Sequence, residues 1–238
     1  MIVEVNFKLR PLPFATRTVT SWGPRGALLS GAQRVIDARL FPVAVELLSR
    51  QLAHETEQSD ENDNCLLIRF AGNGVIEQAR QAVELLECND RQQAAPLDED
   101  DSQIWQSLAE LPLQFREDLV WRVGLLPADV PAFLAQLEQK HCASTPMWQA
   151  GLADGRIRVV QPLAHNGNES NEPGLIAQLE SFRSLAKSLG ATLVIEQAPA
   201  GIRDRMNSSR TTDATFGIMQ RIKQQLDPSG TFPSLSAY

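Results

Sequence analysis

Cysteine and histidine are scarce in this chain: its 238 residues include three of each. Cys65, Cys88 and Cys142 have no C-x-x-C spacing, which favours three reduced thiols over a disulfide framework or an iron–sulfur site. The histidines lie far apart in the sequence and form no H-x-x-x-H pair. The local sequence therefore predicts no metal site.

A basic stripe and a long apolar run are also lacking. The formal net charge of -7 and the pI near 5.1 argue against a nucleic-acid partner, because affinity for a phosphate backbone comes largely from clustered Lys and Arg. The longest apolar runs are of strand length, far below the roughly 20 residues that span a bilayer. The first residues do not resemble a signal peptide. We therefore expect a cytoplasmic protein with no transmembrane segment.

The first part of the chain alternates between strand and helix patterns. Strand patterns occur at 2–9, 16–20 and 65–71, where β-favouring residues recur. Pro42 in the first turn fits a helix over 42–52, and Gly72-Asn73-Gly74 leads into an amphipathic helix over 75–86. Residues 31–40 are ambiguous. The polar, acidic stretch 89–101 is either a surface linker or the lead into a helix through Ile104 and Leu108.

The second part of the chain repeats this rhythm. A strand at 118–125 precedes a helix that starts near Pro127, and Asp154-Gly155 turns a hairpin between 148–151 and 156–160. A helix over about 175–189 and a strand over 191–196 follow. These patterns predict an α+β fold, with a largely antiparallel sheet and helices packed on one face. We interpret the sheet as two ferredoxin-like halves, 1–97 and 98–238.

The last helix and its exit carry the most specific pattern. Phe216, Met219, Ile222 and Leu226 recur at helical spacing, which predicts one buried face. Asp227-Pro228 ends the helix, and the glycine at 230 gives the turn freedom that would allow the phenylalanine at 232 to pack back onto the core.

This tail resembles a family signature. The segment 219–232, Met-x-x-Ile-Lys-x-x-x-Asp-Pro-x-Gly-x-Phe, is similar to the C-terminal signature of FAD-linked oxidases of the vanillyl-alcohol oxidase type, in which it returns from the cap domain towards the flavin. The segments 121–127, 148–158 and 191–200 resemble, in their order, the cap domain of the smaller flavin-type subunit of bacterial glycolate oxidase. The resemblance extends from about Phe7 to Phe232.

The sequence departs from the family in two places. The family usually continues with Asn-Pro-Gly and a basic residue, whereas here Pro233-Ser234-Leu235-Ser236 follows. The glycine-rich pyrophosphate loop of the flavin-binding half has no counterpart, since Gly72-Asn73-Gly74 lacks the third glycine. His165-Asn166-Gly167-Asn168 resembles a metal-associated family run only faintly, and a polar loop is the simpler interpretation.

The resemblance implies that residues 1–238 form the cap of an FAD-dependent oxidoreductase that oxidises a small, glycolate-like 2-hydroxy acid. FAD would be held mainly by an N-terminal domain of the same polypeptide that is absent from this chain, so the fragment alone is expected to be inactive. Other glycolate oxidase subunits, including an iron–sulfur subunit, would be partners, and these could associate the protein with a membrane. The alternative is a non-catalytic ferredoxin-like interaction or scaffold subunit.

Four arginines are candidate site residues. Arg122 lies in a strand and faces away from its neighbours Trp121 and Val123, so it either points to solvent or lines a cleft where its planar guanidinium could bind a substrate carboxylate. Arg69 is placed similarly in its strand, and we assign both to substrate binding. Arg203 and Arg205 follow the segment where the family approaches the flavin, so we assign them to the cofactor. We expect the four tryptophans to lie in the core or at a subunit interface.

Overall fold

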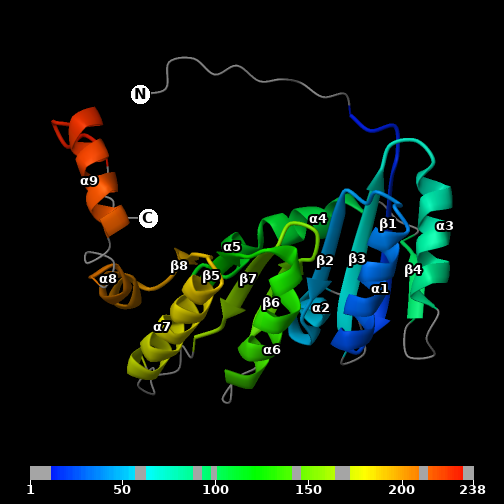
Figure 1. The fold of residues 1–238 in the computed structure, drawn as a ribbon, viewed down its shortest axis with the longest axis horizontal. Helices are drawn as coiled ribbons and strands as arrows, with labels where there is room; N and C mark the ends of the chain where they lie inside the picture. The colour runs from blue at the N-terminus through cyan, green and yellow to red at the C-terminus, as the bar shows by residue number, and fades with distance from the viewer. Residues whose placement is uncertain are drawn as a thin grey trace.

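One antiparallel sheet runs through the molecule (Figure 1). The structure is a computed structural model that describes residues 12–56, 63–87, 93–97, 101–140, 146–163, 172–208 and 214–232. In this part of the chain, eight strands are hydrogen-bonded in the order β4-β1-β3-β2-β6-β7-β5-β8, and every neighbouring pair is antiparallel. The predicted α+β fold with an antiparallel sheet is confirmed.

The strands are β1 (Thr16–Gly23), β2 (Ala44–Leu48), β3 (Asn64–Ala71), β4 (Gln93–Pro96), β5 (Leu119–Gly124), β6 (Met147–Gly151), β7 (Arg156–Gln161) and β8 (Leu193–Gln197). The helices are α1 (Arg25–Asp37), α2 (Arg50–Glu55), α3 (Val75–Leu86), α4 (Ser102–Ala109), α5 (Leu111–Gln114), α6 (Val130–Lys140), α7 (Glu172–Ser188), α8 (Ala200–Ser208) and α9 (Ala214–Leu226). A short 3-10 helix over Pro127–Asp129 leads into α6.

The two halves of the sheet repeat the same order of elements. The first runs β1-α1-β2-β3-α3-β4, with α2 inserted after β2, and the second runs β5-α6-β6-β7-α7-β8. Each is a βαββαβ unit of ferredoxin-like type, and the predicted pair of such halves is confirmed. The second strands of the units, β2 and β6, pair directly, with Leu47 opposite Ala150. The exact boundary between residues 97 and 98 stays a prediction.

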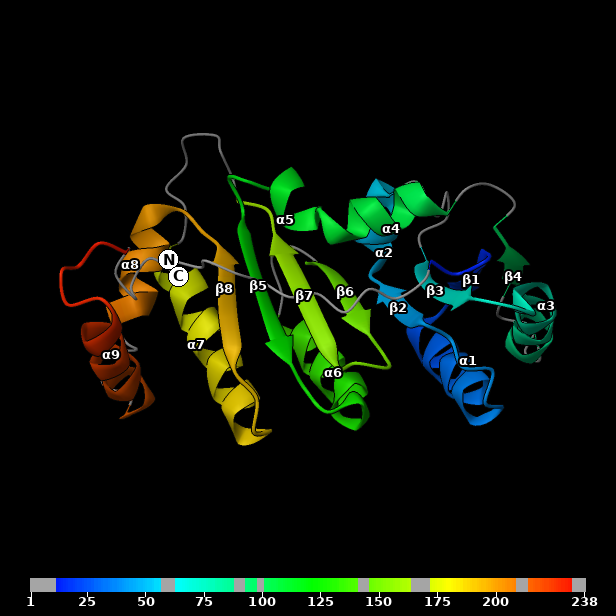
Figure 2. The same ribbon diagram turned by 90° about the horizontal axis from the view of Figure 1, so that it is seen from above.

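The two faces of the sheet are covered to different extents. Helices α1, α3, α6 and α7 pack on one face, where Trp121 and Trp148 are buried in the main apolar core. The shorter α2, α4 and α5 lie on the opposite face over a smaller cluster that includes Leu48, Leu67 and Val120. Figure 2 shows α4 and α5 along one side of the sheet and α1, α6 and α7 along the other. We call the side with the shorter helices the second face.

One local prediction was wrong and another was incomplete, for the same physical reason. The predicted helix over 42–52 is instead β2 followed by α2, and Ser49 caps α2 by accepting a hydrogen bond from the Leu52 amide at 3.3 Å. The stretch 89–101 was predicted to be either a surface linker or the lead into a helix through Ile104 and Leu108. The lead into a helix, α4, is confirmed, but the stretch also contains β4, which pairs with β1. In both segments strand pairing outweighs local propensity. The ambiguous stretch 31–40 belongs largely to α1, and the strand predicted at 2–9 lies outside the described residues.

The prediction for the last helix was also wrong in one respect. The apolar stripe of α9 is exposed: Met219 and Ile222 are about half exposed, and Leu226 is 79% exposed. Phe232 is 51% exposed and does not pack onto the core. Figure 1 shows α9 standing apart from the sheet.

The predicted stop of α9 is confirmed. Gly230 has a φ of 64°, in the left-handed region. Asp227 accepts hydrogen bonds from the amides of Thr231 and Phe232 at 2.7 and 3.0 Å, and from Lys223 Nζ at 2.6 Å. The Lys223 hydrogen bond is the main reason why the pKa of Asp227 lies below its ordinary value. The turn is therefore fixed by its own contacts and needs no support from the core.

Candidate functional site

Arg122 lies on the second face of the sheet. Trp121 and Val123, its neighbours in β5, are buried on the other face, whereas the Arg122 side chain is 44% exposed. The predicted facing of Arg122 is therefore confirmed, and it follows from the strand period of two.

A carboxylate from β8 joins Arg122 to a second arginine. Glu196 Oε1 lies 2.8 Å from Arg122 Nε, and its Oε2 lies 2.7 Å from Arg158 Nε of β7. Arg122 and Arg158 are direct partners in the β5–β7 register, a position where like charges repel. One carboxylate therefore bridges two guanidinium groups.

The outer nitrogens of both guanidinium groups have little to bind within the described part of the chain. Arg158 Nη2 makes only a long contact of 3.5 Å with Glu196, and the Nη groups of Arg122 make no hydrogen bond to the described residues. A guanidinium group binds a carboxylate through two parallel N–H groups. These two side chains can therefore bind a further anion.

An acceptor pair continues this row across β6 and β2. Gln149 lies opposite Arg158 in the β6–β7 register, and its Nε2 donates a hydrogen bond to Glu46 Oε2 at 3.2 Å. Gln149 Oε1 is buried and has no hydrogen-bond partner in the described part of the chain. We call Glu46, Gln149, Arg158, Arg122 and Glu196 the polar row.

Burial raises the pKa of Glu46 to about 7. The hydrogen bond from Gln149 opposes this rise, as do the charges of Arg156 and Arg158, while the carboxylate of Asp154 adds to it. Gly151 provides the space for both carboxyl groups. A Cβ atom at this position would lie 2.1 Å from Asp154 Oδ1 and 3.4 Å from Glu46 Oε1.

The charge of this region therefore depends on one proton. The carboxyl groups of Glu46, Asp154 and Glu196 face the guanidinium groups of Arg122, Arg156 and Arg158. When Glu46 is ionised these charges balance, and when Glu46 is protonated one positive charge is left over. Near neutral pH the site can thus become a better anion site by taking up a proton.

A cavity elsewhere in the molecule has different electrostatics. It has a volume of about 430 Å³ and lies beside Ser49 and Trp148, with Arg25 and Glu138 in its wall. Arg25 and Glu138 form an ion pair with each other, so these two charges are already matched. Arg50 also lines this cavity, but the polar row is where two guanidinium groups meet one carboxylate, so we take the polar row as the candidate anion site.

Arg69 also lies on the second face, but it has internal partners. Its Nη2 donates to Asp101 Oδ1 at 2.9 Å, and its guanidinium carbon lies 5.4 Å from the centre of the Trp105 ring. Asp101 is 5% exposed and accepts a second hydrogen bond, from Thr18 Oγ1 at 2.6 Å. Trp105 Nε1 donates to the same hydroxyl at 3.0 Å. The geometry gives Arg69 a structural role, and its role in substrate binding stays a prediction.

Arg203 and Arg205 lie on α8, directly after β8. Arg203 Nη2 donates to the carbonyl oxygen of Ala198 at 3.0 Å, and Arg205 is exposed. Neither is joined to the polar row by a described contact. Their cofactor-binding roles stay predictions.

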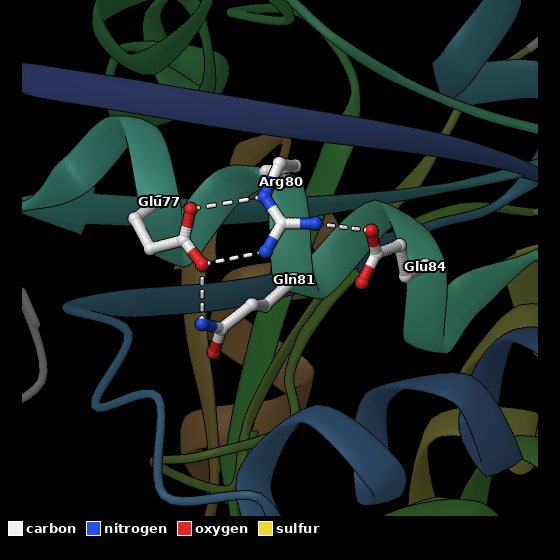
Figure 3. A network of polar contacts seen from close by, with 4 residues as sticks. All are labelled: Glu77, Arg80, Gln81 and Glu84. Carbon is white, nitrogen blue, oxygen red and sulfur yellow. Dashed lines mark hydrogen bonds and ion pairs between the residues drawn. The ribbon is translucent and has the colours of Figure 1, made fainter.

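The turn at Gly72–Gly74 does not fit a cofactor pyrophosphate. Gly74 caps α3 with a φ of 80°, and Glu77 lies in the first turn of this helix. Figure 3 shows Glu77 held by Arg80 and Gln81, with Arg80 also contacting Glu84. The hydrogen bonds from Arg80 are the main reason why the pKa of Glu77 falls to about 2. A carboxylate that stays ionised in the first turn occupies the place where a helix would attract a phosphate.

Other chemistry is limited within the described residues. No group of three or more His, Cys, Asp or Glu residues there could hold a metal ion. Cys65 is a free buried cysteine, and burial raises the pKa of its thiol to about 12, whereas Cys88 and Cys142 lie outside the described residues. The run His165–Asn168 also lies outside them. None of the described helices is both long enough and apolar enough to cross a bilayer.

Solved structures with this fold exist, although no protein-family model and no curated protein matches the sequence. The 4-ethylphenol oxidase from Gulosibacter chungangensis, solved with isoeugenol, matches with a TM-score of 0.60 at 14% identity over 96% of this chain. An alkyldihydroxyacetonephosphate synthase matches with a TM-score of 0.51 at 13% identity over 91% of this chain. The chain spans 55% and 44% of these proteins, about half their length.

These matches establish a shared fold. They are consistent with the predicted resemblance to FAD-linked oxidases of the vanillyl-alcohol oxidase type. Neither of the two is a glycolate oxidase, so that finer assignment is not supported by them.

Sequence reasoning found one member of the polar row and missed four. Arg158 gave the same signal as Arg122, because buried Ile157 and Val159 flank it in β7. Glu46 was hidden because its segment was predicted to be a helix. Gln149 and Glu196 matter only through their partners in the neighbouring strands, and strand order does not follow from local sequence.

Proposed function

We propose that this chain is the cap domain of an FAD-linked oxidase, with the second face of its sheet turned towards the substrate. The single observation that carries the proposal is the fold likeness to 4-ethylphenol oxidase over 96% of the chain. The resemblance of the C-terminal signature supports the same assignment from an independent property, the sequence.

We further propose that the substrate is a small 2-hydroxy acid, as in the smaller flavin-type subunit of glycolate oxidase. The polar row supports a charged substrate, because Arg122 and Arg158 share one carboxylate and the Arg122 side chain is 44% exposed. A phenol, by contrast, would leave these two cations with Glu196 as their one shared anionic partner. In this proposal Arg122 binds the substrate carboxylate, and Arg69 stays a second candidate.

FAD would be held by another domain of the same polypeptide, because the described residues offer no fitting pyrophosphate loop. When bound, FAD would accept the hydride from the substrate α-carbon. The residues of this chain would bind and orient the acid and exclude water from it. Arg203 and Arg205 on α8 are the candidates for contact with the cofactor.

The exposed stripe of α9 fits this arrangement. Ile218, Met219, Ile222 and Leu226 are each at least half exposed on a helix that stands apart from the sheet. Exposed apolar groups at helical spacing are typical of a surface that packs on another domain. In the proposal this surface packs on the flavin-binding domain, and amide exchange in α9 should slow when that domain is present.

The test uses the polypeptide that carries this chain together with its flavin-binding domain. Under anaerobic conditions, glycolate or lactate should bleach the visible absorbance of the bound oxidised flavin, whereas 4-ethylphenol should not. Bleaching by 4-ethylphenol alone would overturn the 2-hydroxy acid while keeping the oxidase. A polypeptide that binds no flavin would overturn the oxidase itself.

The second candidate function is a non-catalytic interaction or scaffold subunit, and the α9 stripe is the observation that favours it. Such a subunit would bury the stripe against a partner without flavin. Slowed exchange in α9 within a complex that contains no flavin would support this alternative.

A further inference from the structure

We infer that the polar row is a carboxylate-binding site that takes up a proton on Glu46 when the anion binds. The choice of a 2-hydroxy acid as its ligand rests on the proposed function. The site itself rests on the geometry of this chain and can be tested without flavin.

The first step of the argument is the spacing of the arginines. Glu196 spans Arg122 and Arg158 with one oxygen on each Nε, at 2.8 and 2.7 Å. These two guanidinium groups are therefore close enough for one carboxylate to contact both. The Nη groups of Arg122 have no described partner, and Arg158 Nη2 has only a 3.5 Å contact with Glu196, so these groups can donate to a second carboxylate. That carboxylate would relieve the repulsion between the cross-strand like charges.

The second step is the acceptor side of the row. Gln149 separates Arg158 from Glu46 and has a buried Oε1 with no partner in the described part of the chain. A buried carbonyl without a donor is costly, so a rotation of the Gln149 side chain that brings Oε1 to a hydroxyl group on the ligand would be favoured. A ligand whose carboxylate binds the two arginines and whose neighbouring hydroxyl group binds Gln149 would be a hydroxy acid.

The third step couples the anion to a proton. The charged groups that act on Glu46 are Asp154 in the β6–β7 turn and Arg156 and Arg158 in β7. Arg69, on the neighbouring strand β3, is paired with Asp101 and does not offset the charge of Glu46. A carboxylate held by Arg158 adds a negative charge near Glu46 and favours its neutral form. The proton enters from solvent, and no covalent bond changes.

The test measures glycolate binding to the 238-residue chain by NMR. The Nε–H signals of Arg122 and Arg158 should shift on addition of glycolate, and the apparent affinity should be about tenfold higher at pH 6 than at pH 8. The carboxyl carbon signal of Glu46 should titrate at higher pH when glycolate is present. The wild-type titration needs no substitution, so it remains decisive if a variant does not fold.

Three variants sharpen the test. Arg158→Met should lower the affinity for glycolate about tenfold or more, and Glu46→Gln should keep the binding but remove its pH dependence. Arg80→Met on α3 changes the net charge by the same amount as Arg158→Met at a remote exposed site, so it should change neither property. The comparison therefore separates a local contact from a general effect of charge.

Several outcomes would overturn the inference. Glycolate that binds Arg158→Met as tightly as the wild type, or a Glu46 titration unmoved by glycolate, would do so. Inorganic phosphate binding as tightly as glycolate would overturn the assignment to a carboxylate. Because this assay contains no flavin, its failure leaves the oxidase proposal intact, and failure of the flavin assay leaves this site intact.

Discussion

The two halves of the second face use arginine in different ways. In the first half, α4 brings Asp101 and Trp105 onto Arg69, so this cation is part of the packing between helix and sheet. In the second half, Arg122 is 44% exposed and shares its only described ion-pair partner with Arg158. Two arginines in equivalent strand patterns thus differ because a helix covers only one of them. Whether an arginine has a structural role or can bind a ligand therefore depends more on how deeply its carboxylate partner is buried than on the arginine itself.

The largest expected effect concerns the covered half. Arg69→Met should lower the free energy of unfolding by about 3 kcal/mol, because Asp101 would remain buried without its cation. Chemical denaturation at neutral pH measures this loss. The double variant Arg69→Met/Asp101→Asn is the control and should recover part of it. Equal stability of Arg69→Met and the wild type would show that α4 does not depend on this pair.

The next prediction concerns the polar row and its pH dependence. The pKa of Glu46 rises from 4.5 to about 7 on folding, so the folded state binds more protons than the unfolded state between these values. The stability contributed at Glu46 is therefore greatest below pH 4.5 and falls as the pH rises towards 7. Because Glu46 is only partly buried, we expect the free energy of unfolding to fall by about 2 kcal/mol as the pH rises through this range.

Glu46→Gln should remove this loss. The variant should match the wild type near pH 4.5 and be more stable than it by about 2 kcal/mol at pH 8. Thermal unfolding across this range measures the difference. Parallel pH profiles for the two proteins would contradict the raised pKa of Glu46.

The sequence predicted architecture better than local detail. The alternation around Arg122 and the hairpin at Asp154-Gly155 gave correct strands, because each depends on nearby residues. The segment 42–52 gave a wrong helix, because β2 is held by pairing with β3 and β6 rather than by its own propensity. That error concealed Glu46 and, with it, the acceptor side of the site. The sequence left Asp101 either in a surface linker or in the lead into a helix and gave no sign of its burial, because its partners Thr18 and Arg69 are more than 30 positions away.

The third prediction returns to the covered half. Trp105→Phe should lower the free energy of unfolding by about 1 kcal/mol, because the hydrogen bond to Thr18 is lost and the stacking on Arg69 is weakened. The same denaturation experiment measures it. If Trp105→Phe had no effect in the wild-type background, the indole would be only a hydrophobic cover for Arg69.

The smallest expected effect on stability is at Arg122. Arg122→Met should change the free energy of unfolding by less than about 0.5 kcal/mol, because Arg122 is 44% exposed and Glu196 keeps its ion pair with Arg158. The same substitution should lower the catalytic efficiency with a 2-hydroxy acid about tenfold to a hundredfold in the flavin-containing polypeptide, because a charge-assisted contact to the substrate carboxylate is lost. Steady-state kinetics and denaturation of one variant thus measure both quantities. A loss of stability as large as that of Arg69→Met would make the two arginines alike and remove the distinction between the halves.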